Sequence, residues 1–177
     1  MSILYNIVMD KIRKEIEDKA SETLLKYGDN NLFVDPIKIA RKIGFTVCEA
    51  DFEDDMESFI LADENEIKLK DISSNRIIGV SRELIWMKKR EAIAKELGYF
   101  LLSNEKDDFA HKTYESDKEG IDPFTISLLL PADKLIQENE KLSKKDFSFE
   151  QKTRILAQNF GVSALLMVYR FGELGLY

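Results

Sequence analysis

The amino-acid sequence predicts an α+β fold, in which a small antiparallel or mixed sheet of three to four strands is packed by helices. Two observations predict it. Residues 45–81 carry short apolar groups separated by polar clusters, which is typical of short strands. The segments on either side repeat apolar residues at helical spacing. The chain has 177 residues, and we expect a single domain made of an N-terminal helix (1–30), a core (34–135) and a C-terminal helical pair (149–177).

The first helices are predicted from their ends. Residues 3–27 form a long amphipathic helix that Gly28 ends. A short helix follows, with Asp35 as its N-cap, Pro36 at its first position and Gly44 at its end. The strand segment comes next, and antiparallel pairing is the simplest expectation for it. A central helix is then predicted over 82–102.

The second half of the chain begins with a highly charged segment, 103–120, which we expect to be an exposed loop. A loop of this length inside a compact domain is uncommon and often functional. A buried helix, 124–130, is stopped by Pro131, and a polar helix follows over 132–140. Residues 149–171 are predicted to form a helix, a turn at Gly161 and a second helix that Ser163 can cap.

Composition excludes several classes of protein. The formal charge of −7 gives the molecule a negative field that repels phosphate, so nucleic acid is not expected as a partner. No segment has the roughly 18 consecutive apolar residues that a membrane helix needs. The single cysteine, Cys48, cannot form an intramolecular disulfide, so we expect the reducing cytoplasm, with Cys48 as a small core residue.

Several segments together resemble the ImmA/IrrE family of zinc metallopeptidases. VDPIKIARKIGFTV, residues 34–47, resembles the family's opening helix and strand. REAIAKELGYFLL, residues 90–102, corresponds to the helix that carries the family's HExxH zinc motif, with KELGY in place of the motif. Residues 124–131 resemble the end of the helix that supplies the third zinc ligand, and 156–176 resemble the C-terminal helical pair. The resemblance implies a zincin-like fold.

The departures from the family motif bear on the chemistry. In HExxH, two histidines on one helical face bind zinc, and the glutamate activates a zinc-bound water. Lys95 and Tyr99 replace the two histidines, and only Glu96 is retained. Protonated lysine has no lone pair, and tyrosine is a poor zinc ligand unless it is ionised. The position of the third ligand is occupied by Gly120, with Glu119 beside it.

We therefore predict a pseudopeptidase that binds no metal and no other cofactor. For Lys95 two interpretations remain open. Its ammonium could pair with Glu96 or Glu119 and replace the charge of the metal, or Lys95 and Tyr99 could simply line a solvated cleft. The second is favoured because buried ion pairs often fail to recover their desolvation cost. Glu96 as a residual catalytic base is disfavoured.

The only histidine, His111, lies in the charged loop near Asp107, Asp108 and Glu115. Solvent exposure is the favoured interpretation, because this spacing matches no structural metal motif. The alternative hypothesis is an active metallo-endopeptidase that cleaves a helix-turn-helix repressor. Its metal site would be rebuilt from the side chains of Glu96, Glu119, Asp122 and His111.

The helical pair at 156–171 has the outline of a DNA-reading motif. Its second helix is almost wholly apolar, with Arg170 as its only basic residue, whereas recognition helices need polar and cationic side chains. We expect core packing, and the apolar excess fits a protein contact. The resemblance implies a role in phage, mobile-element or stress regulation. We expect this chain to bind a repressor- or toxin-type protein without cutting it, with the loop 103–120 as a contact region.

Overall fold

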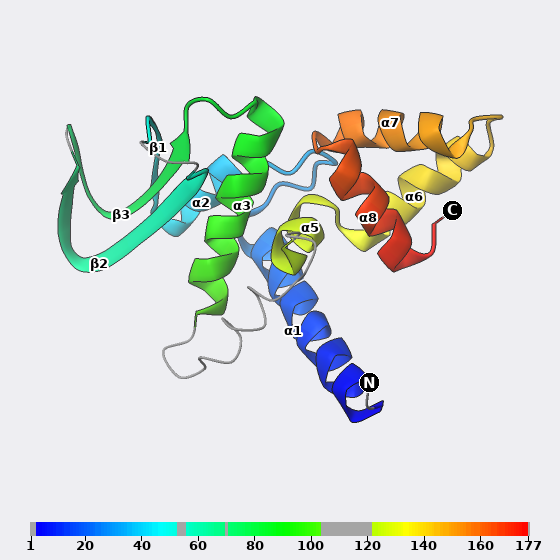
Figure 1. The fold of residues 1–177 in the computed structure, drawn as a ribbon, viewed down its shortest axis with the longest axis horizontal. Helices are drawn as coiled ribbons and strands as arrows, with labels where there is room; N and C mark the ends of the chain where they lie inside the picture. The colour runs from blue at the N-terminus through cyan, green and yellow to red at the C-terminus, as the bar shows by residue number, and fades with distance from the viewer. Residues whose placement is uncertain (1–2, 53–55, 70, 104–121, 177) are drawn as a thin grey trace.

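The computed structural model describes residues 3–52, 56–69, 71–103 and 122–176, which form a mixed α+β fold. Figure 1 shows helix α3 (Trp86–Leu102) standing between a small sheet on one side and helices α5 to α8 on the other. Helix α3 contacts two of the strands as well as helices α2 and α5. The helix that corresponds to the family's motif helix is therefore the central element of the fold.

The N-terminal helices begin and end where the sequence predicts. Helix α1 spans Ile3–Tyr27, and α2 spans Pro36–Ile43. Asp35 caps α2 because its Oδ1 accepts the backbone N–H groups of Ile37 (3.0 Å) and Lys38 (3.3 Å). Gly44 ends the helix at a φ of 105°, a left-handed conformation that favours glycine.

The later helices also match the predictions, except that the polar helix extends past residue 140 and the central helix begins after residue 82. They are α5 (Pro123–Leu129), α6 (Ala132–Ser143), α7 (Phe149–Phe160) and α8 (Ala164–Leu174). Ser163 caps α8 as predicted, since its Oγ accepts the N–H of Leu166 at 3.3 Å. Helix α3 begins at Trp86 and not at residue 82, because the chain first makes a turn after the last strand, where Glu83 N–H donates to Ser81 Oγ at 3.3 Å.

The sheet is mixed and contains strands β1 (Thr46–Ala50), β2 (Ser58–Leu69) and β3 (Ile72–Ser81) in the order β1-β3-β2. Strands β2 and β3 pair antiparallel, whereas β1 pairs parallel with β3. The expectation of antiparallel pairing throughout is therefore wrong for β1. Strand β3 lies between the other two strands; it pairs antiparallel with β2, which precedes it in the chain, and it runs in the same direction as β1.

One core cluster joins the sheet to the helices. Buried apolar residues come from β3, from α3 and from the α5 to α8 segment, and include Ile78, Val80, Ile93, Leu97, Phe124, Leu128, Leu156, Phe160 and Phe171. The rings of Phe45 and Phe100 pack edge to face with centroids 4.9 Å apart. The predicted buried helix is confirmed, because six of the residues of α5, from Phe124 to Leu129, are buried.

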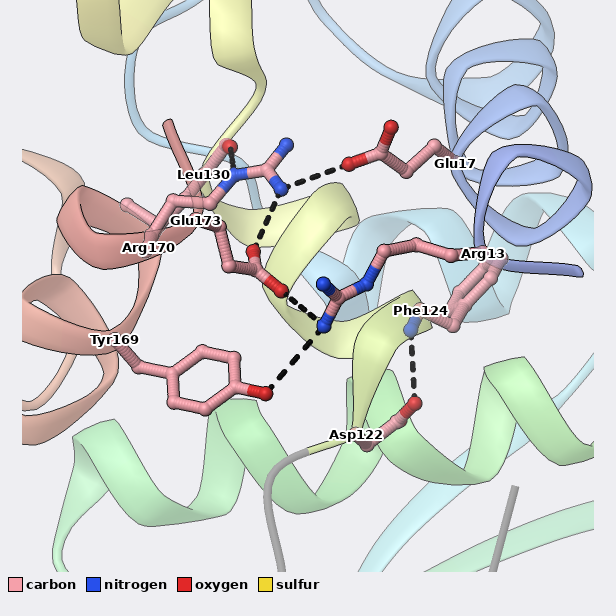
Figure 2. A network of polar contacts seen from close by, with 8 residues as sticks. All are labelled: Arg13, Glu17, Asp122, Phe124, Leu130, Tyr169, Arg170 and Glu173. Carbon is pink, nitrogen blue, oxygen red and sulfur yellow. Dashed lines mark hydrogen bonds and ion pairs between the residues drawn. The ribbon is translucent and has the colours of Figure 1, made fainter. Parts of the chain in front are cut away.

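The last helix is held to the body by a buried arginine, as Figure 2 shows. Arg170 is only 3% exposed. Its Nε donates to the backbone oxygen of Leu130 (3.2 Å), and its Nη1 donates to Glu17 Oε1 and Glu173 Oε2, both at 2.8 Å. Arg13 of α1 in turn contacts Glu173 at 2.6 Å. The prediction that this helical pair is packed in the core is confirmed for its buried face.

Within the described ranges, no helix combines the length and apolarity needed to cross a bilayer.

Candidate functional site

Three residues of the motif lie on α3, and one of them, Lys95, lines a cleft. Because residues four apart share one face of a helix, Lys95 and Tyr99 lie side by side, and the Lys95 Nζ is 5.6 Å from the centre of the Tyr99 ring. Lys95 is exposed and Tyr99 is half-buried. The structure thus brings together the two side chains that replace the imidazoles of the motif.

Glu96 points away from the solvent and is engaged by the sheet. It is 6% exposed, and its Oε1 accepts a hydrogen bond from Ser58 Oγ at 2.7 Å, where β2 begins. Burial raises the pKa of the Glu96 carboxyl, although the Ser58 hydroxyl and the Lys95 ammonium both act to lower it. A carboxylate that is buried and already hydrogen-bonded is poorly placed to take a proton from a water in the cleft.

The phenol of Tyr99 is disfavoured as a metal ligand. Burial raises the pKa of Tyr99, and the nearby carboxylates of Asp122 and Glu96 raise it further, while Lys95 acts against them. Zinc would need the ionised phenolate, which this environment makes harder to form. Of the two residues expected to line a cleft, Lys95 lines the one described below, whereas Tyr99 is not among its lining residues.

The cleft beside Lys95 has a volume of about 100 Å³. Its walls come from α3, from the first turns of α5 and α8, and from the residue before β2. The lining residues are Glu57, Lys88, Glu91, Ala92, Lys95, Asp122, Thr125, Ser163, Leu165 and Leu166. A space of this size accepts one or two side chains of another molecule.

Two of the carboxylates in the cleft make contacts that stabilise the fold. Glu91 accepts the backbone N–H of Ser163 (3.0 Å) at one oxygen and the ammonium of Lys88 (2.8 Å) at the other. Asp122 caps α5, accepting the N–H of Phe124 at 2.8 Å and the hydroxyl of Thr125. Each of these carboxylates is therefore partly neutralised by a cation or by donors from the protein itself.

Arg90, next to Glu91 on α3, holds the turn between α7 and α8. Its guanidinium donates to the backbone oxygens of Gly161 and Val34 and stacks on the ring of Phe33, 4.0 Å from the centroid. Arg90 is 5% exposed, and burial lowers its pKa to about 10, which still leaves it charged at neutral pH. This role of Arg90 could not be predicted from the sequence, because the backbone oxygens that it binds have no signature there.

The residues present do not fit a zinc site of the HExxH type. In the part of the chain that the structure describes, no group of three or more His, Cys, Asp or Glu side chains is placed to hold a metal ion. Lysine and tyrosine at the two imidazole positions offer no neutral nitrogen lone pair. The predicted third-ligand position, Glu119 and Gly120, and the loop histidine His111 lie outside the described residues.

Cys48 is not part of this site. It lies on β1, and its thiol contacts the backbone oxygen of Ile78 at 3.8 Å. Burial raises the pKa of the Cys48 thiol, which disfavours the reactive thiolate. The interpretation of Cys48 as a small packing residue agrees with this position, although the side chain is only partly buried.

The small mixed sheet, the central α3 and the cleft beside its motif residues define a zincin-like metallopeptidase scaffold. The chain belongs to the family of IrrE N-terminal-like domains, peptidase family M78, whose model matches residues 40–171. No curated protein matches the chain in sequence.

The fold is also similar to a solved structure described as a Mycobacterium tuberculosis transcriptional regulator. The TM-score is 0.56 at 15% sequence identity, over 91% of this chain and 50% of that chain. At this identity the similarity concerns the fold alone. The chain therefore spans about half the length of that neighbour.

The structure adds residues that the sequence could not assign to the site. Ser58 reaches Glu96 from a position 38 residues earlier in the chain, and Ser163 reaches Glu91 from 72 residues later. Both are single serines with no neighbouring pattern. Lys88 could have been inferred, because lysine three residues before Glu91 on a helix is a common ion pair.

Proposed function

We propose that this protein is a pseudopeptidase of the ImmA/IrrE type, which binds a protein partner in transcription regulation and does not cut it. The partner would be of the repressor or toxin type that the family resemblance implies, in phage, mobile-element or stress regulation. The family match and the fold of the regulator that it resembles support this setting.

One observation carries the proposal. The two positions that should provide imidazole nitrogens hold an exposed ammonium and a half-buried phenol, 5.6 Å apart between Nζ and ring centre. The glutamate between them is buried and hydrogen-bonded to Ser58. A site that lacks two of its zinc ligands cannot lower the pKa of a bound water by the route that these peptidases use.

The proposal is tested by the metal content of the purified chain. Wild-type protein is expressed with added zinc, dialysed, and analysed by mass spectrometry of the elements. A Lys95→His, Tyr99→His double variant serves as the control, because it restores two imidazoles four residues apart on the same scaffold. We expect the double variant to retain more zinc than the wild type, which should retain only traces.

The alternative hypothesis, an active metallo-endopeptidase, makes the opposite prediction. A site rebuilt from Glu96, Asp122 and side chains of the loop would give the wild type one zinc per chain. Loss of that zinc in an Asp122→Asn variant would locate the metal. Stoichiometric zinc in the wild type would refute the pseudopeptidase proposal, and repressor cleavage would then be the activity to measure.

Partner binding is supported by the surface beside the cleft. Leu165 is 66% exposed and Val168, one turn further along α8, is 44% exposed. Exposed apolar residues that adjoin a cleft are typical of protein contact sites. Capture of native partners by wild type, compared with a Leu165→Asp variant, tests this step. A partner that binds both forms equally would show that the cleft is not the contact site.

A further inference from the structure

The two lysines of the cleft differ in whether a carboxylate pairs with them. Lys88 is paired with Glu91 at 2.8 Å. For Lys95, by contrast, no carboxylate oxygen of a described residue lies within 4.0 Å of the ammonium. Its nearest aromatic neighbour is the Tyr99 ring. The ammonium also hydrogen-bonds to the Tyr99 side chain, but it carries three N–H donors, so it keeps hydrogen-bonding capacity for an acid from another molecule.

The carboxylates near Lys95 do not remove this capacity. Glu91 and Asp122 accept donors from their own helices and turns, and Glu96 accepts the Ser58 hydroxyl. Glu57 is exposed at the rim of the cleft, where water screens its charge. A single acidic group from another molecule could thus approach Lys95, whereas a run of acidic residues would meet repulsion from Glu57.

The other side of the cleft is apolar. Leu165 and Leu166 line it from α8, and Ala92 lines it from α3. Leu166 is buried, whereas Leu165 is mostly exposed and has lost little of its contact with water. Covering its side chain with an apolar group of a partner would remove apolar surface from water, which favours binding.

We propose that the cleft recognises an extended segment of a partner protein by one acidic side chain, which binds the Lys95 ammonium, and one bulky apolar side chain, which packs on Leu165. This inference rests on the proposed function and specifies the chemistry of the partner. The acid accepts a charge-assisted hydrogen bond, and the apolar side chain fills the α8 side of the cleft. Lys95 is then a specificity-determining residue and not merely a lost metal ligand.

The test uses random peptides displayed on phage and selected on the full-length chain. The enriched peptides should share one Asp or Glu close to a Leu, Ile, Met or Phe. The strongest binder is synthesised with a fluorescent label, together with a version in which the acid is replaced by its amide. Fluorescence anisotropy then gives the Kd of both peptides for each protein variant.

On the wild type, exchanging the acid for its amide should weaken binding by about tenfold, the size of one charge-assisted hydrogen bond. On Lys95→Gln the same exchange should change Kd by less than about twofold. Lys68→Gln, an exposed lysine on β2, is the matched control and should behave as the wild type does. Leu165→Ser should weaken both peptides alike.

The outcomes separate this inference from the proposed function. Enriched peptides without an acid, or an acid preference that persists in Lys95→Gln, overturn the inference and leave partner binding in place. If the chain enriches no peptide, the inference is overturned as well, and the metal content then decides on the proposed function. Lys95 and Leu165 are exposed, so their variants should fold, and circular dichroism verifies this for each.

Discussion

Replacing Arg170 with methionine should destabilise the protein far more than the same replacement at Arg154. Arg170 is 3% exposed and donates three hydrogen bonds, one to Leu130 and two to the carboxylates of Glu17 and Glu173. Removing one partner of a buried ion pair costs about 3–5 kcal/mol. Glu17 is 40% exposed and Glu173 keeps Arg13, so both carboxylates remain partly compensated. We therefore expect a loss of about 2–4 kcal/mol.

Urea unfolding followed by circular dichroism measures this loss, and the melting temperature should fall by roughly 5–12 °C for a chain of this size. The control, Arg154→Met, lies on α7 and removes an exposed pair with Glu150, whose side chains are 72% and 82% exposed. That change should cost less than about 0.5 kcal/mol. If the two variants lost equal stability, the conclusion that Arg170 is a packing residue of the helical pair would be wrong.

Three further predictions concern Glu96, Gly161 and Asp35. Burial raises the pKa of Glu96, so its ionisation destabilises the fold as the pH rises from the ordinary carboxyl pKa through the raised one. Glu96→Gln should therefore become more stable relative to the wild type as the pH rises through that range, with no such gain below it. A stability difference in urea unfolding that does not depend on pH would contradict the raised pKa. Gly161→Ala should cost more than the ~1–2 kcal/mol of a left-handed backbone, because the new Cβ would lie 2.5 Å from the Phe33 ring and 2.6 Å from Arg90 Nη1. Gly175→Ala, where φ is 64° and the new Cβ would have no atom of a described residue within 4 Å, measures the backbone cost alone, and equal losses would exclude the steric effect. Asp35→Ala should cost about 1 kcal/mol in thermal unfolding by removing the α2 cap, and Asp35→Asn should restore most of it; a silent Asp35→Ala would show that the cap contributes nothing.

The helices could be predicted because their signals are local. The caps of α2 and α8 and the proline that follows α5 are each determined by a few neighbouring residues, and the structure has them where the sequence places them. The sheet was harder to predict from the sequence. The apolar groups at 59–61 and 67–69 belong to one strand, whose pairing with β3 is irregular between Ala62 and Ile67. The direction in which two strands pair depends on how distant segments of the chain are brought together, and the spacing of apolar residues in the sequence does not determine it.

Parts of the candidate site could likewise be predicted from the sequence, and other parts could not. The positions of Lys95 and Tyr99 on one face follow from helical spacing alone. The direction of the Glu96 side chain could not be predicted, because it depends on a serine at the beginning of β2. The same holds for Arg90, whose guanidinium binds backbone oxygens before α2 and after α7.

Adjacent residues of α3 hold the turn between α7 and α8 at two points, Arg90 at Gly161 and Glu91 at Ser163. The α8 wall of the cleft therefore cannot swing independently of the helix that forms the opposite wall. A ligand would meet a preorganised shape, and its binding would not have to supply the free energy needed to order these walls. A substitution that loosens the turn at Gly161 would accordingly weaken binding in a cleft that it does not touch. Binding would then have to order the α8 wall of the cleft, whereas the intact turn already holds that wall in place.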